Sequence, residues 1–229
     1  MIRKVIVITS DKAGSGQTLF SSLLASKIKQ KGYKTALLET SMSPYLPYYM
    51  GYDTARALDI VPGGIVPPIS QFSYPYLSPL LFMNQSNRPV FWEKEDIVKF
   101  IRKMVLNTNW GDVDILLLDL PLCQLEMIKD LKAFFSDKLS QSLMLIDPRT
   151  KESEQAKAYL HYMKDNTTLL KIIQSPIKTK NKNADKKIRL PFVESVWNEN
   201  VLASEIPSLL VDAYDSSLEE VSKVCLSIF

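Results

Sequence analysis

A short apolar run that passes into a glycine-rich loop and then into a helical pattern constrains this chain most. The run covers residues 4–9, and residues 10–18 have the sequence Ser-Asp-Lys-Ala-Gly-Ser-Gly-Gln-Thr. Residues 18–31 place leucine and isoleucine at helical spacing and stop at Gly32, a typical helix end. Backbone N–H groups and a helix N-terminus converge in such a turn, so the segment predicts a phosphate-binding βα unit.

Further apolar runs alternate with helical patterns along the rest of the chain. Strands are predicted at residues 35–38, 80–83, 115–118, 143–146, 169–173 and 188–190. Helices are predicted at residues 93–106, 126–135, 151–163 and 217–228. Continuous apolar strands that alternate with helices indicate an α/β fold, with a doubly wound, mostly parallel sheet covered by helices on both faces. We expect one domain over residues 1–229, because no linker divides the chain.

Composition is that of an ordinary soluble globular protein. The 229 residues are 46% hydrophobic and 23% charged, and an excess of three positive charges is too small to argue for nucleic acid. The two cysteines, Cys123 and Cys225, cannot build a disulfide framework or a four-cysteine metal site. The chain shows neither a signal peptide nor an apolar run of about 18 residues, so we expect a cytoplasmic protein without a membrane span.

Two segments interrupt the alternation. Residues 42–92 are rich in proline and tyrosine, and so long an irregular excursion is usually functional or mobile. Residues 175–187 carry five lysines among asparagines and contain no aromatic residue for base stacking. The lysine segment therefore predicts a solvated loop, and nucleic acid is not the expected partner.

Three smaller features carry no chemistry of their own. Cys123 has no neighbouring base or second thiol and is expected to be a buried small hydrophobe. His161 lies on the polar side of its predicted helix and should face solvent. The helix at 217–228 carries Glu219 and Glu220, which argue against a basic membrane helix and favour docking on the chain's own domain.

The glycine-rich loop departs twice from the usual phosphate-loop pattern G-x-x-x-x-G-K-[ST]. Asp11 replaces the first glycine and Gln17 replaces the lysine, while Thr18 keeps the hydroxyl that binds Mg²⁺. A charge-assisted hydrogen bond contributes roughly 1.5–3 kcal/mol, so a neutral amide weakens phosphate binding about 10- to 150-fold. Catalysis suffers more, because the lysine also stabilises charge on the transferred phosphoryl group. From this loop alone, a glycine-rich turn without a ligand remains the alternative.

Four further segments extend the pattern. Lys12 stands where the deviant loop K-G-G-x-G-K-[ST] has its upstream lysine, residues 107–121 resemble W-G-x-x-D-[YF]-x-x-x-D-x-P-P, and residues 88–92 resemble P-V-[IVF]-W. Pro44, Pro47 and Gly51 fit the segment after the second strand. Over residues 4–121 the chain thus resembles the Mrp (ApbC) family of the MinD/ParA/Mrp group of ATPases.

The resemblance implies a doubly wound fold that binds ATP with Mg²⁺, dimerises across the nucleotide face and carries iron–sulfur clusters. By correspondence the nucleotide-binding residues are Lys12, Ala13, Gly14, Ser15, Gly16, Gln17 and Thr18. Thr18 and Asp119 correspond to the Mg²⁺ positions. Lys12 corresponds to the lysine that reaches the nucleotide of the partner subunit.

The chain departs from the resemblance where chemistry is expected. Gln17 replaces the phosphate-loop lysine, and Ser41 stands where the family has the aspartate that positions the attacking water. Residues 121–126 lack the family's P-P-G-T-G-D, and the C-x-x-C that holds a cluster is absent, so no iron–sulfur cluster is expected on this chain. Together these losses suggest a degenerate paralogue.

Four hypotheses follow. The leading one is an Mrp-like protein that binds ATP or ADP with Mg²⁺ weakly, with little or no hydrolysis, as a binding or regulatory subunit. It would form a homodimer, or a heterodimer with an intact Mrp-like ATPase, linked to iron–sulfur protein assembly through a partner. The second is an active ATPase in which Lys12 substitutes for the missing lysine, with Lys12 and Asp119 as its catalytic residues. The third is a partition-type protein acting on DNA or a membrane surface through residues 178–187, and the fourth is an inactive nucleotide site with residues 42–92 as a protein interface.

Overall fold

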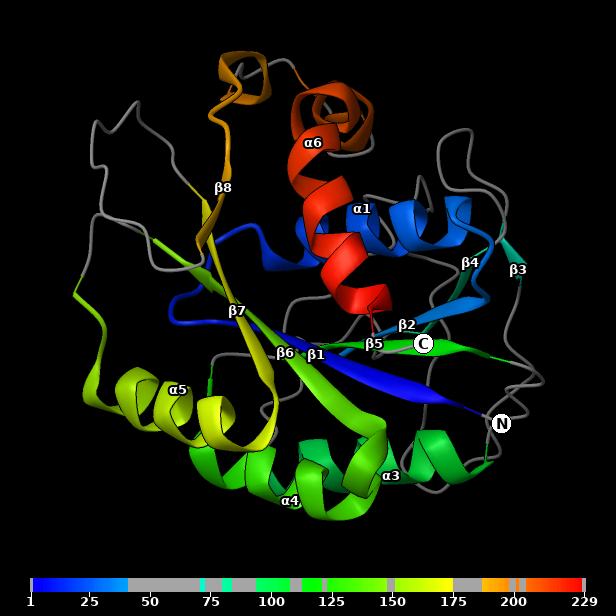
Figure 1. Ribbon diagram of the computed structural model, residues 1–229, viewed down its shortest axis with the longest axis vertical. Helices are drawn as coiled ribbons and strands as arrows, with labels where there is room; N and C mark the ends of the chain where they lie inside the picture. The colour runs from blue at the N-terminus through cyan, green and yellow to red at the C-terminus, as the bar shows by residue number, and fades with distance from the viewer. Residues whose placement is uncertain are drawn as a thin grey trace.

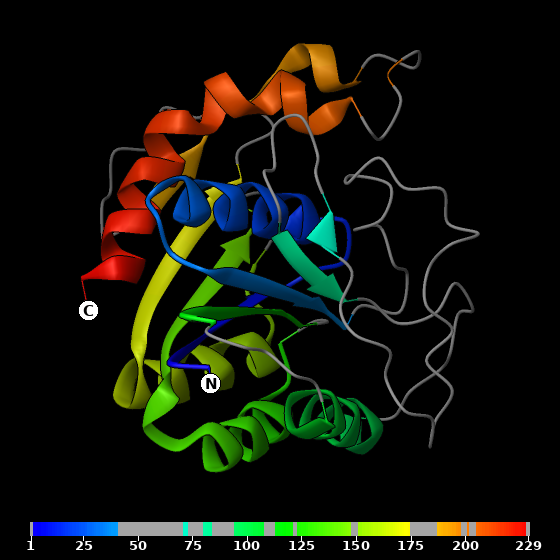
Figure 2. The same ribbon diagram turned by 90° about the vertical axis from the view of Figure 1, so that its right-hand side faces the viewer.

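An eight-stranded sheet runs through the molecule, with helices on both of its faces (Figures 1 and 2). The computed structural model describes residues 2–40, 71–72, 80–83, 94–107, 113–120, 123–147, 151–174, 187–197, 201 and 205–227. The strand order is β3-β4-β2-β5-β1-β6-β7-β8, and β3 alone among the described strands pairs antiparallel. The predicted doubly wound α/β fold is confirmed.

The elements have the following bounds. The strands are β1 (Lys4–Ser10), β2 (Thr35–Glu39), β3 (Gln71–Phe72), β4 (Leu80–Met83), β5 (Ile115–Asp119), β6 (Leu139–Ile146), β7 (Thr168–Gln174) and β8 (Lys187–Leu190). The helices are α1 (Gln17–Gln30), α3 (Lys94–Asn107), α4 (Leu125–Phe135), α5 (Glu154–Asn166) and α6 (Ile206–Leu226). Single 3₁₀ turns occur at η2 (Ser136–Lys138) and η3 (Glu194–Trp197).

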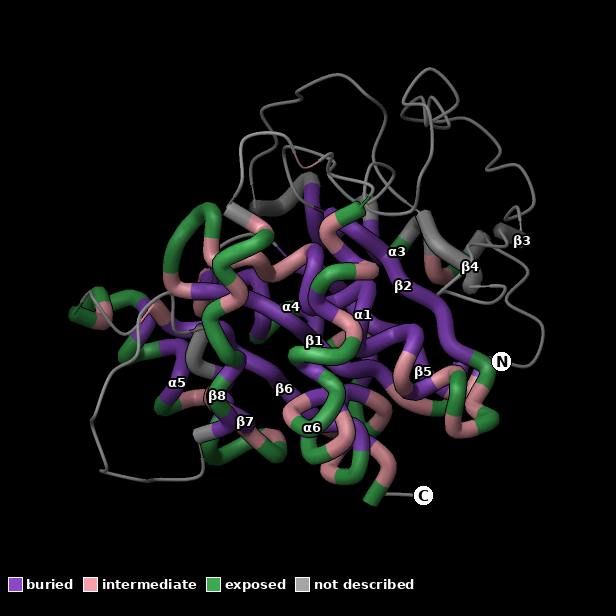
Figure 3. Tube along the Cα trace, turned by 90° about the horizontal axis from the view of Figure 1, so that it is seen from above, coloured by how far each residue is buried: buried purple, intermediate pink, exposed green. Residues whose placement is uncertain are grey.

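Strand β1 shows why the sheet separates two hydrophobic cores. Successive side chains of a strand point to opposite faces, so Val5 and Val7 join the core beneath α3, α4 and α5. Ile6 and Ile8 join the core beneath α1 and α6. All four side chains are fully buried, and burying one such side chain stabilises a fold by about 1.5–3 kcal/mol. In Figure 3 the central strands are buried, whereas the outer sides of the helices are exposed.

Most predicted elements begin within a few residues of their observed starts, but β6 and α6 begin four and eleven residues earlier than predicted. Strand β6 starts at Leu139 rather than residue 143, because Gln141 and Ser142 interrupt the apolar pattern while remaining buried. Their side chains are satisfied in part by neighbours: Gln141 Nε2 donates to the Val224 carbonyl at 2.7 Å, and the Ser142 hydroxyl lies 2.9 Å from the Tyr159 hydroxyl.

Helix α6 is the second such element, since it starts at Ile206 whereas the prediction began at residue 217. Pro207 lies in its first turn, where a missing N–H costs nothing. Strand β3 and strand β4 fall within residues 42–92, and the remainder of that excursion and most of the lysine segment lie outside the described residues.

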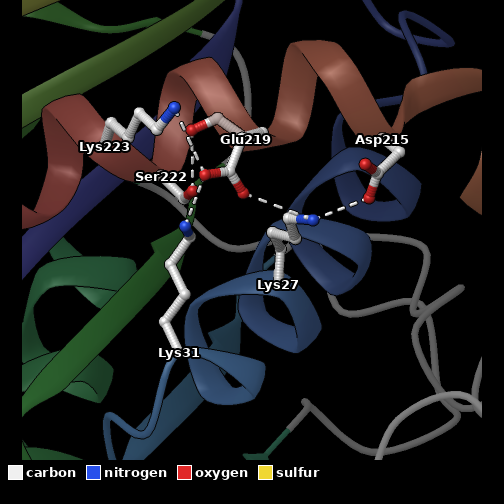
Figure 4. A network of polar contacts seen from close by, with 6 residues as sticks. All are labelled: Lys27, Lys31, Asp215, Glu219, Ser222 and Lys223. Atoms are coloured by element: carbon white, nitrogen blue, oxygen red, sulfur yellow. Dashed lines mark hydrogen bonds and ion pairs between the residues drawn. The ribbon is translucent and has the colours of Figure 1, made fainter.

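Helix α6 docks on the chain's own domain, as the amphipathic pattern predicted, and the helix it packs against is α1. Its buried face includes Leu218, Val221 and Cys225, and Figure 4 shows the polar contacts beside it. Lys31 Nζ lies 2.7 Å from one Glu219 oxygen, and Lys27 Nζ lies 3.4 Å from the other. Three further contacts complete the network: Lys27–Asp215 at 2.6 Å, Lys223–Glu219 at 3.5 Å, and the Ser222 hydroxyl to the Glu219 carbonyl at 2.9 Å.

The described part of the chain contains no helix that is both long enough and apolar enough to span a membrane.

Replacing Glu219 tests how much the contacts between α1 and α6 contribute. The Lys31 ammonium, followed by Lys27 and Lys223, lowers the pKa of Glu219 to about 2, against the opposing effect of burial. A lowered pKa stabilises the fold above the ordinary value, and this contribution is lost as pH falls from about 4.5 towards 2. We expect Glu219→Gln to lower Tm at pH 7 by about 1–3 °C, because the network is partly exposed to solvent.

The matched control is Glu220→Gln, at the exposed next position of the same helix, which should leave Tm unchanged. Thermal unfolding followed by circular dichroism measures both variants. Equal Tm values for the two variants at low salt would show that the network contributes nothing.

Candidate functional site

The glycine-rich loop lies between β1 and α1, at the carboxyl end of a strand that has β5 on one side and β6 on the other. Ligands of open α/β sheets bind at such an edge. Gly14 and Gly16 take φ values of 74° and 76°, a backbone region that favours glycine. The Ser10 hydroxyl donates to the Lys12 carbonyl at 2.9 Å, and the Phe20 N–H donates to the Gly16 carbonyl at 2.9 Å, which starts the helix. The backbone thus has the form of a phosphate cradle.

The predicted ligand residues of the loop differ in exposure. Lys12, Ala13 and Gly14 are exposed, whereas the other four, Ser15, Gly16, Gln17 and Thr18, are half-buried. The first helical residue is Gln17, and α1 has no acidic side chain in its first turn. The positive end of the helix dipole therefore faces the loop without competition from its own first turn.

The Gln17 side chain turns inward to the strand ends. Its Nε2 atom lies 3.1 Å from the Ile8 carbonyl oxygen and 2.5 Å from Asp119 Oδ1, and it also donates to the Leu120 carbonyl oxygen. Three oxygen neighbours identify this atom as the amide nitrogen, since the amide oxygen would be repelled by all three. An amide has only two hydrogens to donate, so this carboxamide is fully engaged with protein oxygens and has no hydrogen left for a phosphate.

Asp119 is the last residue of β5 and is completely buried. Burial raises the pKa of its carboxyl group to about 6, and contacts from the Thr18, Gln17 and Ser21 side chains oppose that shift. One carboxylate oxygen accepts from Gln17, and the other has no hydrogen-bond partner among the described residues. An orphaned carboxylate oxygen next to the Thr18 hydroxyl fits Mg²⁺, which is bound by one or two carboxylates together with phosphate and water. Thr18 and Asp119 would hold the ion.

A row of carboxylates marks the edge of the sheet where the loop lies. The adjacent strands β2, β5, β1 and β6 end in or run into Glu39, Asp119, Asp11 and Asp147 respectively. Glu39 and Asp119 are opposite each other in the pairing of β2 with β5, and the Asp11 N–H donates to the Leu145 carbonyl at 3.4 Å. Neighbouring strands are about 4.8 Å apart, so the four residues occupy adjacent strand ends along this edge, and among them the charge of Asp147 acts on Asp11.

Asp11 lies directly after β1, and its carboxylate is buried. Burial raises its pKa, and so does the charge of Asp147, while backbone N–H groups of Asp147 and Asp11 and the charge of Lys12 oppose the shift. Neither Asp11 carboxylate oxygen is accessible to solvent, and neither completes a hydrogen bond with a described residue. In the sequence Asp11 stands out only as a missing glycine, and neither Glu39 nor Asp147 stands out. The feature of the sequence that could have identified these three residues is that an acidic residue follows each of several apolar runs.

The cysteines and the histidine lie as predicted. Cys123 is buried, and burial raises the pKa of its thiol to about 11, with a further contribution from the Asp11 charge. Cys225 is buried in the core on the opposite side of the sheet, so the two thiols cannot share a ligand. The His161 side chain is 84% exposed, and its Nε2 is 3.9 Å from Asp165. Among the described residues no three His, Cys, Asp or Glu side chains are grouped closely enough to hold a metal ion. Ser41 lies outside the described residues.

Replacing Asp119 tests the cost of burying its charge. Because the folded pKa, about 6, is above the ordinary 3.8, the folded state binds more protons between these values, and stability falls as pH rises through them. We expect Asp119→Asn to raise the free energy of unfolding at pH 7.5 by about 1–3 kcal/mol. The gain should shrink as pH falls from 6 to 4.

Urea unfolding at several pH values measures this difference. Asp130→Asn, at an exposed position of α4, is the control and should change stability little at any pH. A destabilised Asp119→Asn protein at pH 7.5 would show that the carboxylate is better compensated than its contacts indicate.

Comparison with known proteins agrees with this geometry. Residues 1–173 match the model of a ParA family described as the NUBPL iron-transfer P-loop NTPase. An iron–sulfur cluster carrier protein of Clostridium perfringens is 30% identical over 128 residues, which are 52% of this chain and 45% of that protein. A cytosolic Fe-S cluster assembly factor Nubp2 homolog of Drosophila virilis is 27% identical over 124 residues, 52% of this chain and 46% of that protein. The chain spans less than half the length of these relatives.

Solved structures share the fold at low sequence identity. A nucleotide-binding protein of Archaeoglobus fulgidus in complex with ADP superposes with a TM-score of 0.64 at 16% identity, covering 96% of this chain and 91% of that one. The septum site-determining protein MinD of Pyrococcus horikoshii, complexed with Mg-ADP, also gives 0.64, at 13% identity, covering 99% of this chain and 98% of that one. The resemblance to the MinD/ParA/Mrp group is confirmed: with the match over residues 1–173, the chain belongs to the NUBPL iron-transfer P-loop NTPase family.

Proposed function

We propose that this chain binds ATP or ADP with Mg²⁺ weakly and hydrolyses ATP slowly or not at all, acting as a binding or regulatory subunit. The supporting observation is the contrast between the backbone of the glycine-rich loop and the side chain of Gln17. The backbone of residues 10–16 keeps the form of a phosphate cradle, while the Gln17 amide donates to Ile8, Asp119 and Leu120 oxygens. Binding by backbone N–H groups survives such a change, but the cation that stabilises charge during phosphoryl transfer does not.

A partner subunit would supply what this chain lacks. Lys12 is exposed on the loop, where it is available to a nucleotide bound by a second subunit. The two cysteines lie in cores on opposite sides of the sheet, so an iron–sulfur cluster would be held by the partner. The curated relatives include an iron–sulfur cluster carrier and a cytosolic assembly factor, and these names support the proposal of a role in iron–sulfur protein assembly in the cytosol. The partner is either a second copy or an intact relative.

Restoring the lysine tests the proposed loss of phosphate binding. We expect Gln17→Lys to bind ADP about 10- to 150-fold more tightly, because an ammonium replaces a neutral amide. Isothermal titration calorimetry with ADP and Mg²⁺ measures the change, and an ATPase assay accompanies it. Gln17→Ala is the control: it removes the amide without adding charge and should show no gain. Wild-type ATP turnover equal to that of Gln17→Lys would refute the proposal of weak or absent hydrolysis.

An active ATPase that relies on Lys12 is the second candidate, because this exposed lysine and Thr18 accompany an intact backbone cradle. If Lys12 replaces the missing lysine, Lys12→Ala should abolish any Mg²⁺-dependent ATP turnover. Measured phosphate release that is the same for Lys12→Ala and wild type would rule this candidate out. Lys129→Ala, at an exposed position of α4, is the matched control for loss of a surface lysine.

A further inference from the structure

The peptide unit that joins Asp119 to Leu120 is anchored from both sides. Its N–H group, from Leu120, donates to the Ile8 carbonyl of β1 at 2.9 Å. Its carbonyl group, from Asp119, accepts the Thr40 N–H at 2.9 Å and the Thr40 hydroxyl at 2.9 Å. A carbonyl oxygen has two lone pairs, so Thr40 uses the full hydrogen-bonding capacity of this group. These contacts fix the peptide plane next to the Asp119 side chain.

The Thr40 hydroxyl is an addition to the regular ladder between β2 and β5. These strands pair in parallel up to Glu39 opposite Asp119, and the Thr40 N–H continues the pairing by one residue (Figure 1). The main-chain hydrogen bond would form with any residue except proline at position 40. The second bond needs a hydrogen-bond donor on a short side chain, so it depends on the identity of residue 40.

Thr40 approaches Asp119 from the side of the sheet opposite to α1. Side chains alternate along a strand, and Leu38 joins the core beneath α3, α4 and α5. Thr40, two positions further, is on that side and is completely buried. The Asp119 carboxylate is on the other side, where the Gln17 and Thr18 side chains of α1 contact it. Thr40 therefore acts on the backbone of Asp119 and not on a ligand of the site.

The Asp119 carboxylate is held at one oxygen and open at the other. Oδ1 accepts from Gln17, whereas Oδ2 has no hydrogen-bond partner among the described residues. Magnesium demands near-ideal octahedral geometry, so a carboxylate oxygen that binds it must keep one direction. The direction of a side chain depends on the backbone that carries it. The two bonds from Thr40 therefore contribute to the orientation of the open oxygen.

We propose that Thr40 is a positioning residue for Asp119: its hydroxyl holds the backbone of Asp119 and so directs the free carboxylate oxygen towards the Mg²⁺ position. The inference rests on the proposed binding of ADP or ATP with Mg²⁺, and it adds to that function a residue outside the glycine-rich loop. Residues that hold a metal ligand in place by hydrogen bonds typically contribute roughly 10- to 100-fold to metal affinity. Thr40 acts through the main chain, so we expect an effect of about 10-fold.

Calorimetric titration with ADP, in MgCl₂ and in EDTA, tests this role. Thr40→Val removes the hydroxyl and keeps the shape of the side chain, so ADP should bind about 10-fold more weakly in MgCl₂ and with unchanged affinity in EDTA. Thr40→Ser keeps the hydroxyl and should retain the wild-type affinity in both arms. Thr35→Val is the matched control, because it removes a buried hydroxyl of the same strand that donates to the Tyr33 carbonyl at 3.0 Å. It should change neither affinity.

A double-mutant cycle establishes whether Thr40 acts through Asp119. Asp119→Ala removes the carboxylate, so adding Thr40→Val to this variant should cause no further loss of ADP affinity in MgCl₂. Circular dichroism establishes that each variant is folded. Thr40→Ala, which removes the same hydroxyl, repeats the comparison with Thr40→Ser.

Each outcome decides between the inference and the function on which it rests. Equal ADP affinity of wild type and Thr40→Val in MgCl₂ overturns the inference and leaves nucleotide binding standing. A loss that is equal in both arms, a loss that Thr40→Ser shares, or a wild-type affinity that does not depend on Mg²⁺ also overturns it. Absence of ADP binding by the wild type in MgCl₂ refutes the proposed function, and the inference fails with it. A loss confined to MgCl₂, restored by serine and absent from the Asp119→Ala background, supports both.

Discussion

The contact of one amide nitrogen with three oxygens organises the candidate site. Gln17 Nε2 joins the first turn of α1 to the ends of β1 and β5, through Ile8, Asp119 and Leu120. The Gln17 amide has two hydrogens and three protein oxygens that can accept them, so both hydrogens are used within the protein. The side chain at the position that would otherwise contact a phosphate therefore stabilises the fold instead. This attachment leaves the cradle without a basic side chain at position 17, and it also opposes the effect of burial on the pKa of Asp119.

Local pattern was enough to predict the framework of the fold. Residues 5–8 and 115–118 are apolar throughout, and Gly32, with a φ of 91°, follows the end of α1, so burial and turn chemistry both specify these elements locally. The start of β6 could not be predicted in the same way, because Gln141 interrupts the apolar pattern. The Val224 carbonyl that accepts the Gln141 hydrogen bond lies on α6, more than eighty positions further along the chain. Polar residues buried by distant partners carry no periodic signal.

The sequence indicated three residues of the candidate site, but it did not indicate how their side chains are directed. The resemblance identified Gln17, Thr18 and Asp119, and the structure brings these three side chains together. The inward direction of Gln17 depends on main-chain oxygens of Ile8 and Leu120, which have no residue-specific signature. The acidic row at the strand ends depends on the strand order, and a linear sequence places Glu39, Asp119 and Asp147 far apart.

The salt-bridge network between α1 and α6 has a mechanical consequence. Lys27 lies in α1, the helix whose first residue is Gln17, and Lys31 follows its last residue; both contact Glu219 of α6 (Figure 4). The salt bridges therefore attach α6 to the C-terminal end of α1, while the N-terminal turn of α1 is held through Gln17 by the ends of β1 and β5. The helix that follows the glycine-rich loop is thus fixed independently at both of its ends.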